Sequence, residues 1–446
     1  MAELQEVLQS VSDVIWGWPM VILLLGTHLV LTIRLKFIQR YLGRAIKISL
    51  GRGKEGEGDV SQFGALTTAL AATIGTGNIV GVATAIAAGG PGAVFWMWIS
   101  GIFGIATKYS EALLSVKYRI RTEDGTMAGG PMYVIERGMG WRWLGVVFAA
   151  LTTVTAFGIG NMVQANSIAT MLHDAYAIPT AASGVVMAIL TAVVIIGGIK
   201  SIARVCERLV PFMAIMYVGG CLVLLAMGME HIPGTIGLIF SSAFAGQAVV
   251  GGFMGATIKE AIRYGVARGL FSNESGLGSA PIVAAAAQTS DPVRQALVSS
   301  TGTFWDTVVV CAITGLTIVN SGEWLGGLSG AQLTRAAFGD FPVIGPFVLA
   351  VGLLTFVFST ILGWAYYGEK AAEYLFGKKV IVPYRWLWVV FVLVGSVLSL
   401  QVVWTFADIA NALMALPNLI SLIALSGVII QETRRYLWDA EGPSKP

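Results

Sequence analysis

Long runs of hydrophobic residues, separated by short polar stretches, dominate the pattern of this chain. A helix needs about 20 apolar residues to cross the hydrocarbon core of a bilayer, and many of the runs reach that length. The stretch 259–290 is amphipathic and interrupted, and we expect it to form interfacial helices instead of a span. The pattern predicts eleven transmembrane helices, at residues 16–37, 62–88, 92–117, 143–172, 180–199, 207–229, 238–258, 295–319, 343–368, 384–404 and 409–431.

Basic residues fall almost entirely in the connections on one side of the predicted membrane. Counting Lys108, which lies within a span but near that side, 27 of the 28 lysines and arginines belong to it, including those of 259–294. The exception is Arg335. Because lysine and arginine are enriched in cytoplasmic loops, this side is predicted to be cytoplasmic. The N-terminus, with Asp13, is then outside the cell, and the C-terminus is inside.

The composition agrees with an all-α polytopic membrane protein. Of the 446 residues, 56% are hydrophobic and 12% are charged, and the mean hydropathy is +0.76. The charged share is about half that of a soluble domain, which excludes a disordered chain, a nucleic-acid-binding protein and a secreted disulfide-rich domain. We expect a multi-pass protein of the cell membrane that contacts the lipid bilayer.

The residues of common catalytic and metal sites are scarce in this chain. Its three histidines are scattered, and neither a CxxC pair nor a GxxxxGK[ST] loop occurs. A zinc site, a membrane enzyme and an ATP-driven pump are therefore not expected.

Ten of the predicted spans form two groups of five, separated by the loop at 229–234. A repeated unit with an odd number of spans enters the membrane in opposite orientations, as in the inverted repeats of transporters. The predicted divisions are an N-terminal helix with a basic linker (1–61), a first five-helix repeat (62–234), a second, inverted repeat (235–431) and a cytoplasmic tail (432–446).

In such folds the first helix of each repeat is often broken at mid-membrane. The two helices expected to break carry glycine-rich runs at 75–81 and 246–255. Glycine costs about 1 kcal/mol relative to alanine within a helix and accepts positive φ. Unwinding frees backbone N–H and C=O groups, which a zwitterionic ligand and a small cation could satisfy. Close helix packing through small residues is the alternative explanation for these glycines.

Several motifs resemble those of the alanine or glycine:cation symporter family, within the amino acid-polyamine-organocation superfamily. The resemblance extends over about residues 15–430. The motifs are GTGNIVGVATAI at 75–86, GGPGA at 89–93, FWMW at 95–98, AGGPMY at 128–133, GIGNMVQ at 158–164 and FSNESGLGSAP at 271–281.

The resemblance implies a LeuT-type core of five plus five helices with one extra N-terminal helix. It also implies a secondary active transporter that imports small neutral amino acids, such as alanine, glycine or serine, by symport with Na⁺ through alternating access. Na⁺ would be the co-transported ion, with no cofactor and no obligate protein partner. Coupling to H⁺ is the alternative. A channel is a further alternative, but the chain has no repeated filter motif.

An amino acid zwitterion needs donors for its carboxylate and acceptors for its ammonium group. The N–H groups of Thr76, Gly77 and Asn78, at the start of a half-helix, are expected to donate to the carboxylate. The carbonyl groups expected to accept from the ammonium group belong to Thr73, Gly252 and Phe253.

Two further residues are assigned to the substrate site. By resemblance, Gln164 contacts the substrate, whereas a hydrogen bond to another helix is the alternative for an amide inside a span. Trp364 is expected to cap the cavity and limit the size of the side chain. A position in the interfacial aromatic belt is the alternative for Trp364.

Ser359 and Thr360 are adjacent hydroxyl residues inside an apolar helix, where bonding to the preceding turn is their ordinary role. In LeuT-type transporters a matching pair binds Na⁺ together with carbonyl groups just before the first break. The resemblance therefore implies a cation site formed by the backbone of Ala71 and Ile74 and the side chains of Ser359 and Thr360. It is the only metal site predicted.

Buried acids in transmembrane helices are candidates for a functional role. Asp306 is expected to be a proton or cation group, or else a structural acid paired with a hydroxyl such as Thr303. Asn273 and Glu274 are expected to form a structural or gating corner.

Two pairs of opposite charges lie close together in the sequence. Glu111 and Lys108 are one helical turn apart and could form an ion pair. Glu369 and Lys370 are neighbours, and we expect an interfacial charge pair there.

Overall fold

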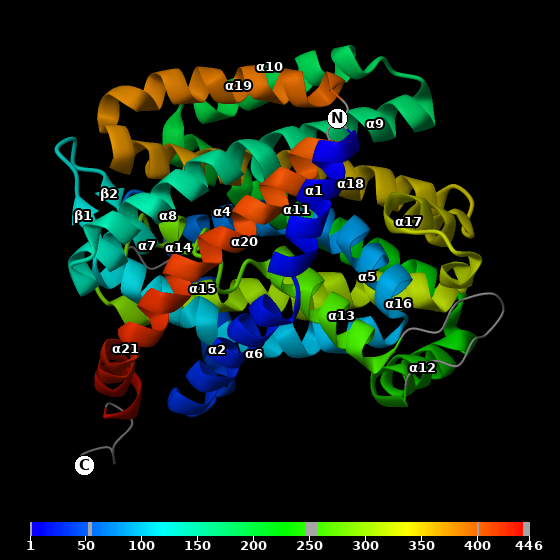
Figure 1. The fold of residues 1–446 in the computed structure, drawn as a ribbon, viewed down its shortest axis with the longest axis horizontal. Coiled ribbons are helices and arrows are strands. Elements are labelled where there is room, and N and C mark those ends of the chain that lie inside the picture. The colour runs from blue at the N-terminus through cyan, green and yellow to red at the C-terminus, as the bar shows by residue number, and fades with distance from the viewer. Residues whose placement is uncertain (1, 52–55, 246–256, 399–400, 440–446) are drawn as a thin grey trace.

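The computed structural model describes residues 2–51, 56–245, 257–398 and 401–439, and helices account for most of them. Figure 1 shows many long helices that run lengthwise through the molecule. Seven of the described helices are long and apolar enough to cross a membrane, or eight when the bent pair at 62–89 counts as one span. The all-α membrane class is thereby confirmed, whereas the count of eleven spans stays a prediction.

The N-terminal segment forms two consecutive helices, α1 (Ala2–Ile15) and α2 (Trp18–Arg34). α2 packs against α6 (Gly92–Lys117), and α1 lies against α20 (Gln401–Ala424). The indole Nε1 of Trp16, between α1 and α2, donates to the carbonyl of Asp408 on α20 at 3.1 Å. The short helices η1 (Ile38–Tyr41) and α3 (Leu42–Ser49) follow.

The first core helix is broken at the start of its glycine-rich run. α4 (Gln62–Thr73) ends before Ile74, whose backbone is extended with φ −77° and ψ 94°. The chain resumes as η2 (Gly77–Gly81) and α5 (Val82–Gly89), bent by 54° from α4. The first helix break therefore lies at 74–76.

A second interrupted helix lies at 258–284. α13 (Ile258–Asn273) packs against α5 and α6, and after residues 274–280 the chain forms α14 (Pro281–Ala284). The residues of 272–287 are buried, so the expectation of interfacial helices at 259–290 is wrong. α12 (Ile232–Ala245) comes before α13, and the predicted break at 246–255 lies wholly outside the described residues.

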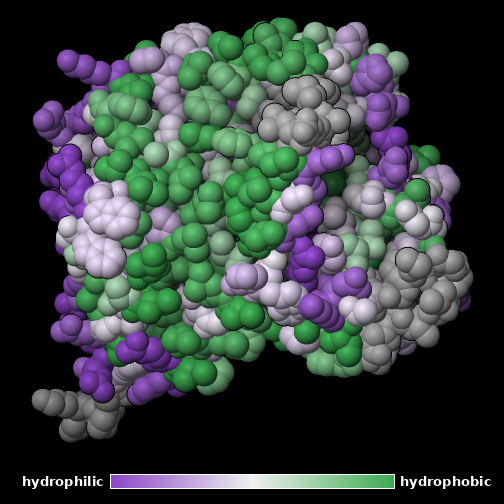
Figure 2. Space-filling model, viewed as in Figure 1, coloured by the Kyte–Doolittle hydropathy of each residue, from purple (hydrophilic) through white to green (hydrophobic). Residues whose placement is uncertain are grey.

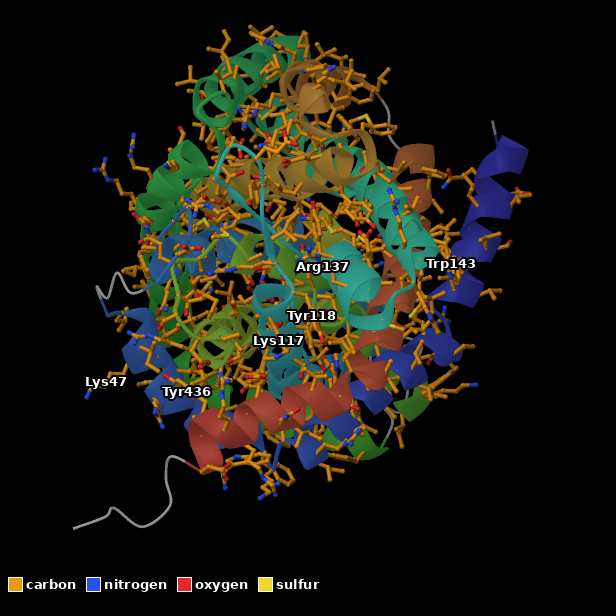
Figure 3. The ribbon with its side chains drawn as sticks, turned by 90° about the vertical axis from the view of Figure 1, so that its left-hand side faces the viewer. Lys47, Lys117, Tyr118, Arg137, Trp143 and Tyr436 are labelled. Atoms are coloured by element: carbon orange, nitrogen blue, oxygen red, sulfur yellow. The ribbon has the colours of Figure 1, made fainter. Side chains whose placement is uncertain are left out.

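The predicted partition of charge also needs a correction on α13. A guanidinium nitrogen of Arg263 lies 3.8 Å from a carboxylate oxygen of Asp13, although the two residues were assigned to opposite sides of the membrane. Asp13 and Arg263 therefore cannot both lie on the sides predicted for them. Other members of that set, Lys47, Lys117 and Arg137, lie at one end of the molecule, which faces the viewer in Figure 3.

Long helices enclose the two interrupted ones. α8 (Arg142–Thr155), η4 (Ala156–Met162) and α9 (Val163–Tyr176) form one apolar helix that packs against α18 (Ile344–Phe376). α11 (Gly198–Met227) packs against α4 and α18. α10 (Thr180–Ile195) and α19 (Ile381–Val397) pack together as an outer layer, at the top of Figure 1.

The remaining helices complete the surroundings of this core. They are α7 (Pro131–Val134), η3 (Ile135–Met139), η5 (Met229–His231), α15 (Pro292–Thr303), η6 (Phe304–Cys311), α16 (Ala312–Ser321), η7 (Glu323–Gly326), α17 (Gly330–Gly339), η8 (Lys378–Val380), α21 (Ser426–Thr433) and η9 (Arg434–Trp438).

A small hairpin and the linker before α4 meet at the basic end. The hairpin strands β1 (Ile120–Arg121) and β2 (Met127–Ala128) are antiparallel. Arg119, just before β1, donates to the carbonyl groups of Glu57 at 2.8 Å, Ala285 at 3.0 Å and Ala287 at 2.8 Å. One guanidinium thus joins the chain before the first break to the chain after the second.

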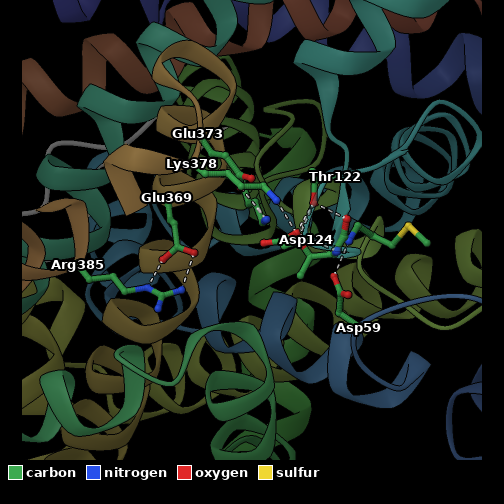
Figure 4. Close-up of polar contacts among 10 residues, drawn as sticks. Asp59, Thr122, Asp124, Glu369, Glu373, Lys378 and Arg385 are labelled. Atoms are coloured by element: carbon green, nitrogen blue, oxygen red, sulfur yellow. Dashed lines mark hydrogen bonds and ion pairs between the residues drawn. The ribbon is translucent and has the colours of Figure 1, made fainter. Parts of the chain in front are cut away.

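Two ion pairs of α18 lie beside this hairpin, one with α19 and one within α18 itself (Figure 4). Arg385 donates to both carboxylate oxygens of Glu369, at 2.6 and 2.9 Å, and Lys370 pairs with Glu373 at 2.7 Å. The expected pair of Glu369 with Lys370 is therefore wrong, because consecutive side chains on a helix point in different directions.

Asp124 and Asp59 anchor the hairpin itself (Figure 4). Lys378 lies 2.7 Å from Asp124, and this contact lowers the pKa of the Asp124 carboxyl below its usual range. Asp59 accepts from the N–H of Met127 at 2.8 Å. The hairpin is thus attached both to η8 after α18 and to the linker before α4.

Candidate functional site

Asn78 braces the first break. Its side-chain oxygen accepts from the N–H of Gly75 at 2.9 Å, and its own N–H donates to the carbonyl of Gly75 at 3.2 Å. Its amide nitrogen donates to Oδ1 of Asp306 at 2.8 Å. Both polar atoms of the buried Asn78 side chain thus already have hydrogen-bond partners within the protein. Thr76 and Gly77 lie at the start of the second half-helix, and the first N–H groups of a helix have no acceptor within it.

The four residues predicted for the cation site lie together. The hydroxyl of Ser359 is 3.2 Å from the carbonyl oxygen of Ala71, and that of Thr360 is 3.4 Å from the carbonyl oxygen of Ile74. Both hydroxyls also contact the carbonyl of Phe356 one turn earlier, at 2.8 and 2.9 Å. These hydroxyl and carbonyl oxygens form a cluster immediately before the break, and such oxygens are suitable ligands for Na⁺.

The described part of the chain offers no cluster of carboxylates or imidazoles as an alternative metal site. No group of three or more histidine, cysteine, aspartate or glutamate side chains is placed there to hold a metal ion. Neutral oxygens are therefore the candidate ligands among the described residues.

Gln164 reaches the first break from α9. Its Nε2 donates to the carbonyl of Ile159 at 2.9 Å and lies 3.4 Å from the hydroxyl of Thr76. Its Oε1 is buried, with no hydrogen-bond partner among the described residues. An unpaired buried acceptor costs about 1–3 kcal/mol, so this oxygen is a favourable place for a donor such as an ammonium group.

The lack of a side chain at Gly75 keeps the centre of this site open. A Cβ atom at Gly75 would lie 2.6 Å from Oγ1 of Thr360 and 3.7 Å from Oε1 of Gln164. Gly75 therefore lies between the cation cluster and the unpaired amide oxygen.

Trp364 lies in the interior and not in an interfacial belt. Its side chain is 1% exposed, and it packs so closely on Gly160 that a Cβ there would lie 2.2 Å from Cβ of Trp364. Its indole Nε1 donates to Oε1 of Glu274 at 3.0 Å, and the other oxygen of Glu274 accepts from the hydroxyl of Ser279. Trp364 thereby connects α18 to the second break.

Glu111 braces the second break. One of its carboxylate oxygens accepts from the N–H groups of Gly276 at 3.0 Å and Gly278 at 3.1 Å, and from the amide of Asn418 at 2.6 Å. Both glycines have positive φ, +93° and +84°. The expected ion pair with Lys108 is not found among the described residues, where the second carboxylate oxygen of Glu111 and Nζ of Lys108 are both buried without a hydrogen-bond partner.

Asp306 links the two interrupted helices. Besides the bond from Asn78, its carboxylate accepts from the hydroxyls of Ser272 at 2.9 Å and Thr307 at 2.7 Å. Its hydroxyl partners are therefore Ser272 and Thr307, whereas the expected partner Thr303 contacts the hydroxyl of Ser275 at 3.0 Å. Asp306 holds the start of one half-helix against the end of α13.

Phe271 and Ser272 are site residues that no local pattern in the sequence singles out. A Cβ atom at Gly77 would lie 3.5 Å from Cδ1 of Phe271 and 3.4 Å from Cα of Ser272. Both residues begin the motif at 271–281, which was the only indication in the sequence. The end of α13 thus packs directly against the first break.

Of the other residues predicted to bind substrate, the structure describes one and not the other two. Thr73 is the last residue of α4 and lines a small cavity together with Lys108 and Asn273. Gly252 and Phe253 lie outside the described residues.

Comparisons with known proteins agree with this arrangement. The model of the sodium:alanine symporter family matches residues 1–445. The sodium/alanine symporter AgcS of Methanococcus maripaludis is 51% identical, and the alignment covers 97% of this chain and 97% of that protein. The amino-acid carrier protein AlsT of Bacillus subtilis is 40% identical, with 95% and 90% covered.

A solved structure supports the fold. The crystal structure of MhsT in complex with L-phenylalanine matches with a TM-score of 0.59 at 16% identity, and the match covers 83% of this chain and 90% of that one. At this identity the likeness shows the fold alone, and it confirms the LeuT-type fold predicted from the resemblance. Because the family model matches almost the whole length of this chain, the chain belongs to the sodium:alanine symporter family.

Proposed function

We propose that this protein imports small neutral amino acids, alanine above all, together with Na⁺ through a site at the first helix break. As a member of its family it is a membrane transporter and not an enzyme, and Na⁺ is the co-transported ion. The observation that carries the proposal is the meeting of Gln164, Ser359 and Thr360 around Gly75. Glycine and serine are the other expected substrates.

The substrate carboxylate is placed at the N–H groups of Thr76 and Gly77, where the positive end of the half-helix dipole favours an anion. The ammonium group is placed at Oε1 of Gln164 and the carbonyl of Thr73. Asn78 takes part by holding the break open, since its side chain is already bonded to Gly75 and Asp306. The proposed contacts with Gly252 and Phe253 belong to the same site.

Na⁺ is placed among the carbonyl oxygens of Ala71 and Ile74 and the hydroxyls of Ser359 and Thr360. Ala71 belongs to α4, Ile74 follows directly after α4, and Ser359 and Thr360 belong to α18, so the bound ion would hold the end of α4 against α18. The cation site and Gln164 flank Gly75, which provides a direct physical route for coupling between ion and substrate.

The membrane potential can supply the driving force. One charge that moves through 100 mV releases about 2.3 kcal/mol, which corresponds to roughly 50-fold accumulation of the substrate. One Na⁺ per amino acid is therefore sufficient for useful import.

We also propose a location in the cell membrane, with the N-terminus outside and the C-terminus in the cytoplasm. The basic end that includes Lys47, Lys117 and Arg137 supports this orientation, because positive residues collect on the cytoplasmic side. Import then follows the inward Na⁺ gradient.

Uptake of radiolabelled alanine into proteoliposomes tests the proposal. We expect accumulation when Na⁺ is higher outside, and only slow equilibration when Na⁺ is equal on both sides. A third preparation with a proton gradient and equal Na⁺ tests H⁺ coupling. Equal uptake in all three preparations would refute symport, and accumulation driven only by the proton gradient would refute coupling to Na⁺.

The substitution Trp364→Ala tests whether the substrate cavity is limited in size. Removal of the indole should let larger neutral amino acids compete with alanine uptake, with inhibition constants lowered roughly 10-fold, the lower end of the effect of one methylene group in an apolar pocket. Trp388→Ala is a matched control, since Trp388 is also buried but stacks against Tyr384 in the outer layer. An unchanged size limit in Trp364→Ala would remove Trp364 from the proposed site.

A further inference from the structure

The segment between α2 and the first core helix α4 is strongly basic. No acidic residue occurs in the sequence between Asp13 and Glu55, whereas seven lysines and arginines occur at 34–54. α2 belongs to the apolar helical stretch Gln5–Arg34, which is long enough to cross a membrane. The helices η1 and α3, which follow directly after Arg34, are therefore placed where the chain leaves the bilayer.

Three of these cations lie on one face of the helix formed by η1 and α3. Arg40, Arg44 and Lys47 are exposed, at steps of four and three residues, and we call them the basic stripe. The stripe is about 10 Å long, at 1.5 Å per residue. The opposite face is buried and consists of Ile38, Tyr41, Ala45 and Ser49.

The contacts of these cations leave positive charge uncompensated. The guanidinium of Arg40 donates to the hydroxyl of Tyr41 at 2.9 Å. The ammonium group of Lys36, just before the stripe, lies 4.4 Å from the centre of the Trp438 ring. Both partners are neutral. In the part of the chain that the structure describes, no carboxylate lies within 4.0 Å of the charged groups of Lys36, Arg40 or Lys47.

Exposed apolar side chains lie at both ends of the basic stripe. Phe37, which is 58% exposed, comes before it, and Leu50, which is 70% exposed, comes after it. Figure 2 shows hydrophilic residues along the left-hand edge of the molecule, beside a broad hydrophobic face, and Figure 3 looks onto that edge, where Lys47 is labelled. A helix that combines exposed cations with exposed apolar side chains is typical of a membrane surface.

The buried face of the segment connects the stripe to the core. α3 packs against α15 and contacts α4, and η1 packs against α6. α4 in turn carries Ala71, one of the residues of the proposed cation site. A ligand on the basic stripe would therefore hold α3 against the helix that leads to the first break.

We propose that the basic stripe binds the headgroups of anionic phospholipids, and that this contact steadies α3 against α4 and α15. A negatively charged membrane surface attracts basic segments that lie next to a transmembrane helix. Phe37 and Leu50 favour a lipid over a dissolved phosphate, because apolar side chains beside the charges can enter the acyl region. The lipid contact stands on its own, whereas its effect on transport rests on the proposed amino acid symport.

Binding of a fluorescent phosphatidylglycerol to the purified full-length protein in a neutral detergent tests the contact. Each lysine or arginine at an anionic surface contributes about a five-fold factor in affinity. We therefore expect Arg40→Gln with Lys47→Gln to bind this lipid roughly 25-fold more weakly than the wild type. Both side chains are exposed, so the variant should keep the thermal unfolding midpoint of the wild type.

Arg121→Gln with Arg142→Gln is the matched control. It also removes two exposed guanidinium groups, but these are paired with Glu57 at 3.6 Å and Glu136 at 3.7 Å. This control should bind phosphatidylglycerol as tightly as the wild type does. Wild-type affinity in Arg40→Gln with Lys47→Gln, or equally tight binding of phosphatidylcholine, would overturn the inference. Displacement of the lipid by inorganic phosphate would also overturn it, since a site for the free anion would then explain the binding.

Alanine uptake into proteoliposomes tests the consequence for transport. The wild type should be faster in an equal mixture of phosphatidylcholine and phosphatidylglycerol than in phosphatidylcholine alone. Arg40→Gln with Lys47→Gln should lose this gain, and the same gain in that variant would contradict a role of the stripe. Absence of Na⁺-dependent uptake from the wild type in both membranes would instead refute the proposed function, and the result of the lipid-binding experiment would stand.

Discussion

The two interrupted helices differ in what satisfies their unwound backbone. At the first break, the side-chain oxygen of Asn78 accepts a hydrogen bond from the N–H of Gly75, and the amide oxygen of Gln164 has no partner among the described residues. At the second break, the Glu111 carboxylate accepts hydrogen bonds from the N–H groups of both Gly276 and Gly278. Glu111 also has one oxygen without a partner among the described residues. The breaks differ in that the protein holds the N–H groups of the second, whereas an unpaired oxygen of Gln164 lies beside Gly75 at the first.

This difference suggests that the first break binds ligands and that the second attaches the core to neighbouring helices. Glu111 belongs to α6 and Asn418 to α20, so the second break is attached to two long helices. Asp306 joins both breaks through Asn78 and Ser272. A change at the first break on binding can therefore reach the end of α13 through hydrogen bonds, and α6 and α20 through the backbone that continues from Ser272 to Gly278.

The largest expected effect concerns the brace of the second break. Glu111→Leu leaves the N–H groups of Gly276 and Gly278 without their acceptor in a buried site, and we expect a loss of about 3–5 kcal/mol in stability. The midpoint of thermal unfolding in detergent measures it. Glu111→Gln keeps an acceptor oxygen and should lose less. Equal midpoints for the two variants would show that the second break does not depend on this brace.

A smaller effect is expected at the first break, where space matters more than bonding. Gly75→Ala places a methyl group 2.6 Å from Oγ1 of Thr360, and overpacking of this kind costs about 1–3 kcal/mol. We expect half-maximal alanine uptake to need roughly 10-fold more Na⁺. Gly81→Ala, whose nearest neighbour would be the carbonyl oxygen of Thr76 at 4.0 Å, is the control and should resemble the wild type. The same Na⁺ requirement in both variants would contradict an open site at Gly75.

The smallest effect concerns Arg119, whose hydrogen bonds join the chain before the first break to the chain after the second. Arg119→Gln removes hydrogen bonds to Glu57, Ala285 and Ala287, and we expect a loss of about 2 kcal/mol. Arg121→Gln removes an exposed ion pair with Glu57 at 3.6 Å and should cost less than about 1 kcal/mol. Unfolding midpoints measure both. A larger shift for Arg121→Gln would indicate that Arg119 does not hold these segments together.

The first break could be predicted from the sequence because its glycines and Asn78 interrupt an otherwise apolar span. The partners of its cation cluster could not be predicted from spacing, since Ala71 and Ser359 lie 288 residues apart and only the family resemblance joined them. In the structure these residues come within hydrogen-bond distance. Their role as ligands stays a prediction.

The stretch 259–290 was expected to be interrupted, but it was placed at the membrane interface because it looks polar. α13 carries Lys259, Arg263 and Arg268, and Glu274 follows directly, so the stretch fails any test of average hydropathy. Glu274 is nevertheless buried, because Trp364 and Ser279 both donate to its carboxylate. Contacts of this kind depend on the tertiary structure, and local sequence patterns do not reveal them.

Alanine binding as a function of Na⁺ concentration, in the double variant Ser359→Ala with Thr360→Ala, tests the central claim most directly. Thr355→Ala is the control, because among the described residues its hydroxyl bonds to the preceding turn of α18 alone. We expect the double variant to require at least roughly 10-fold more Na⁺ for half-maximal binding, since two oxygen ligands are lost, while alanine still binds at saturating Na⁺. A Na⁺ dependence identical to that of the wild type and of Thr355→Ala would contradict a cation site at the first break.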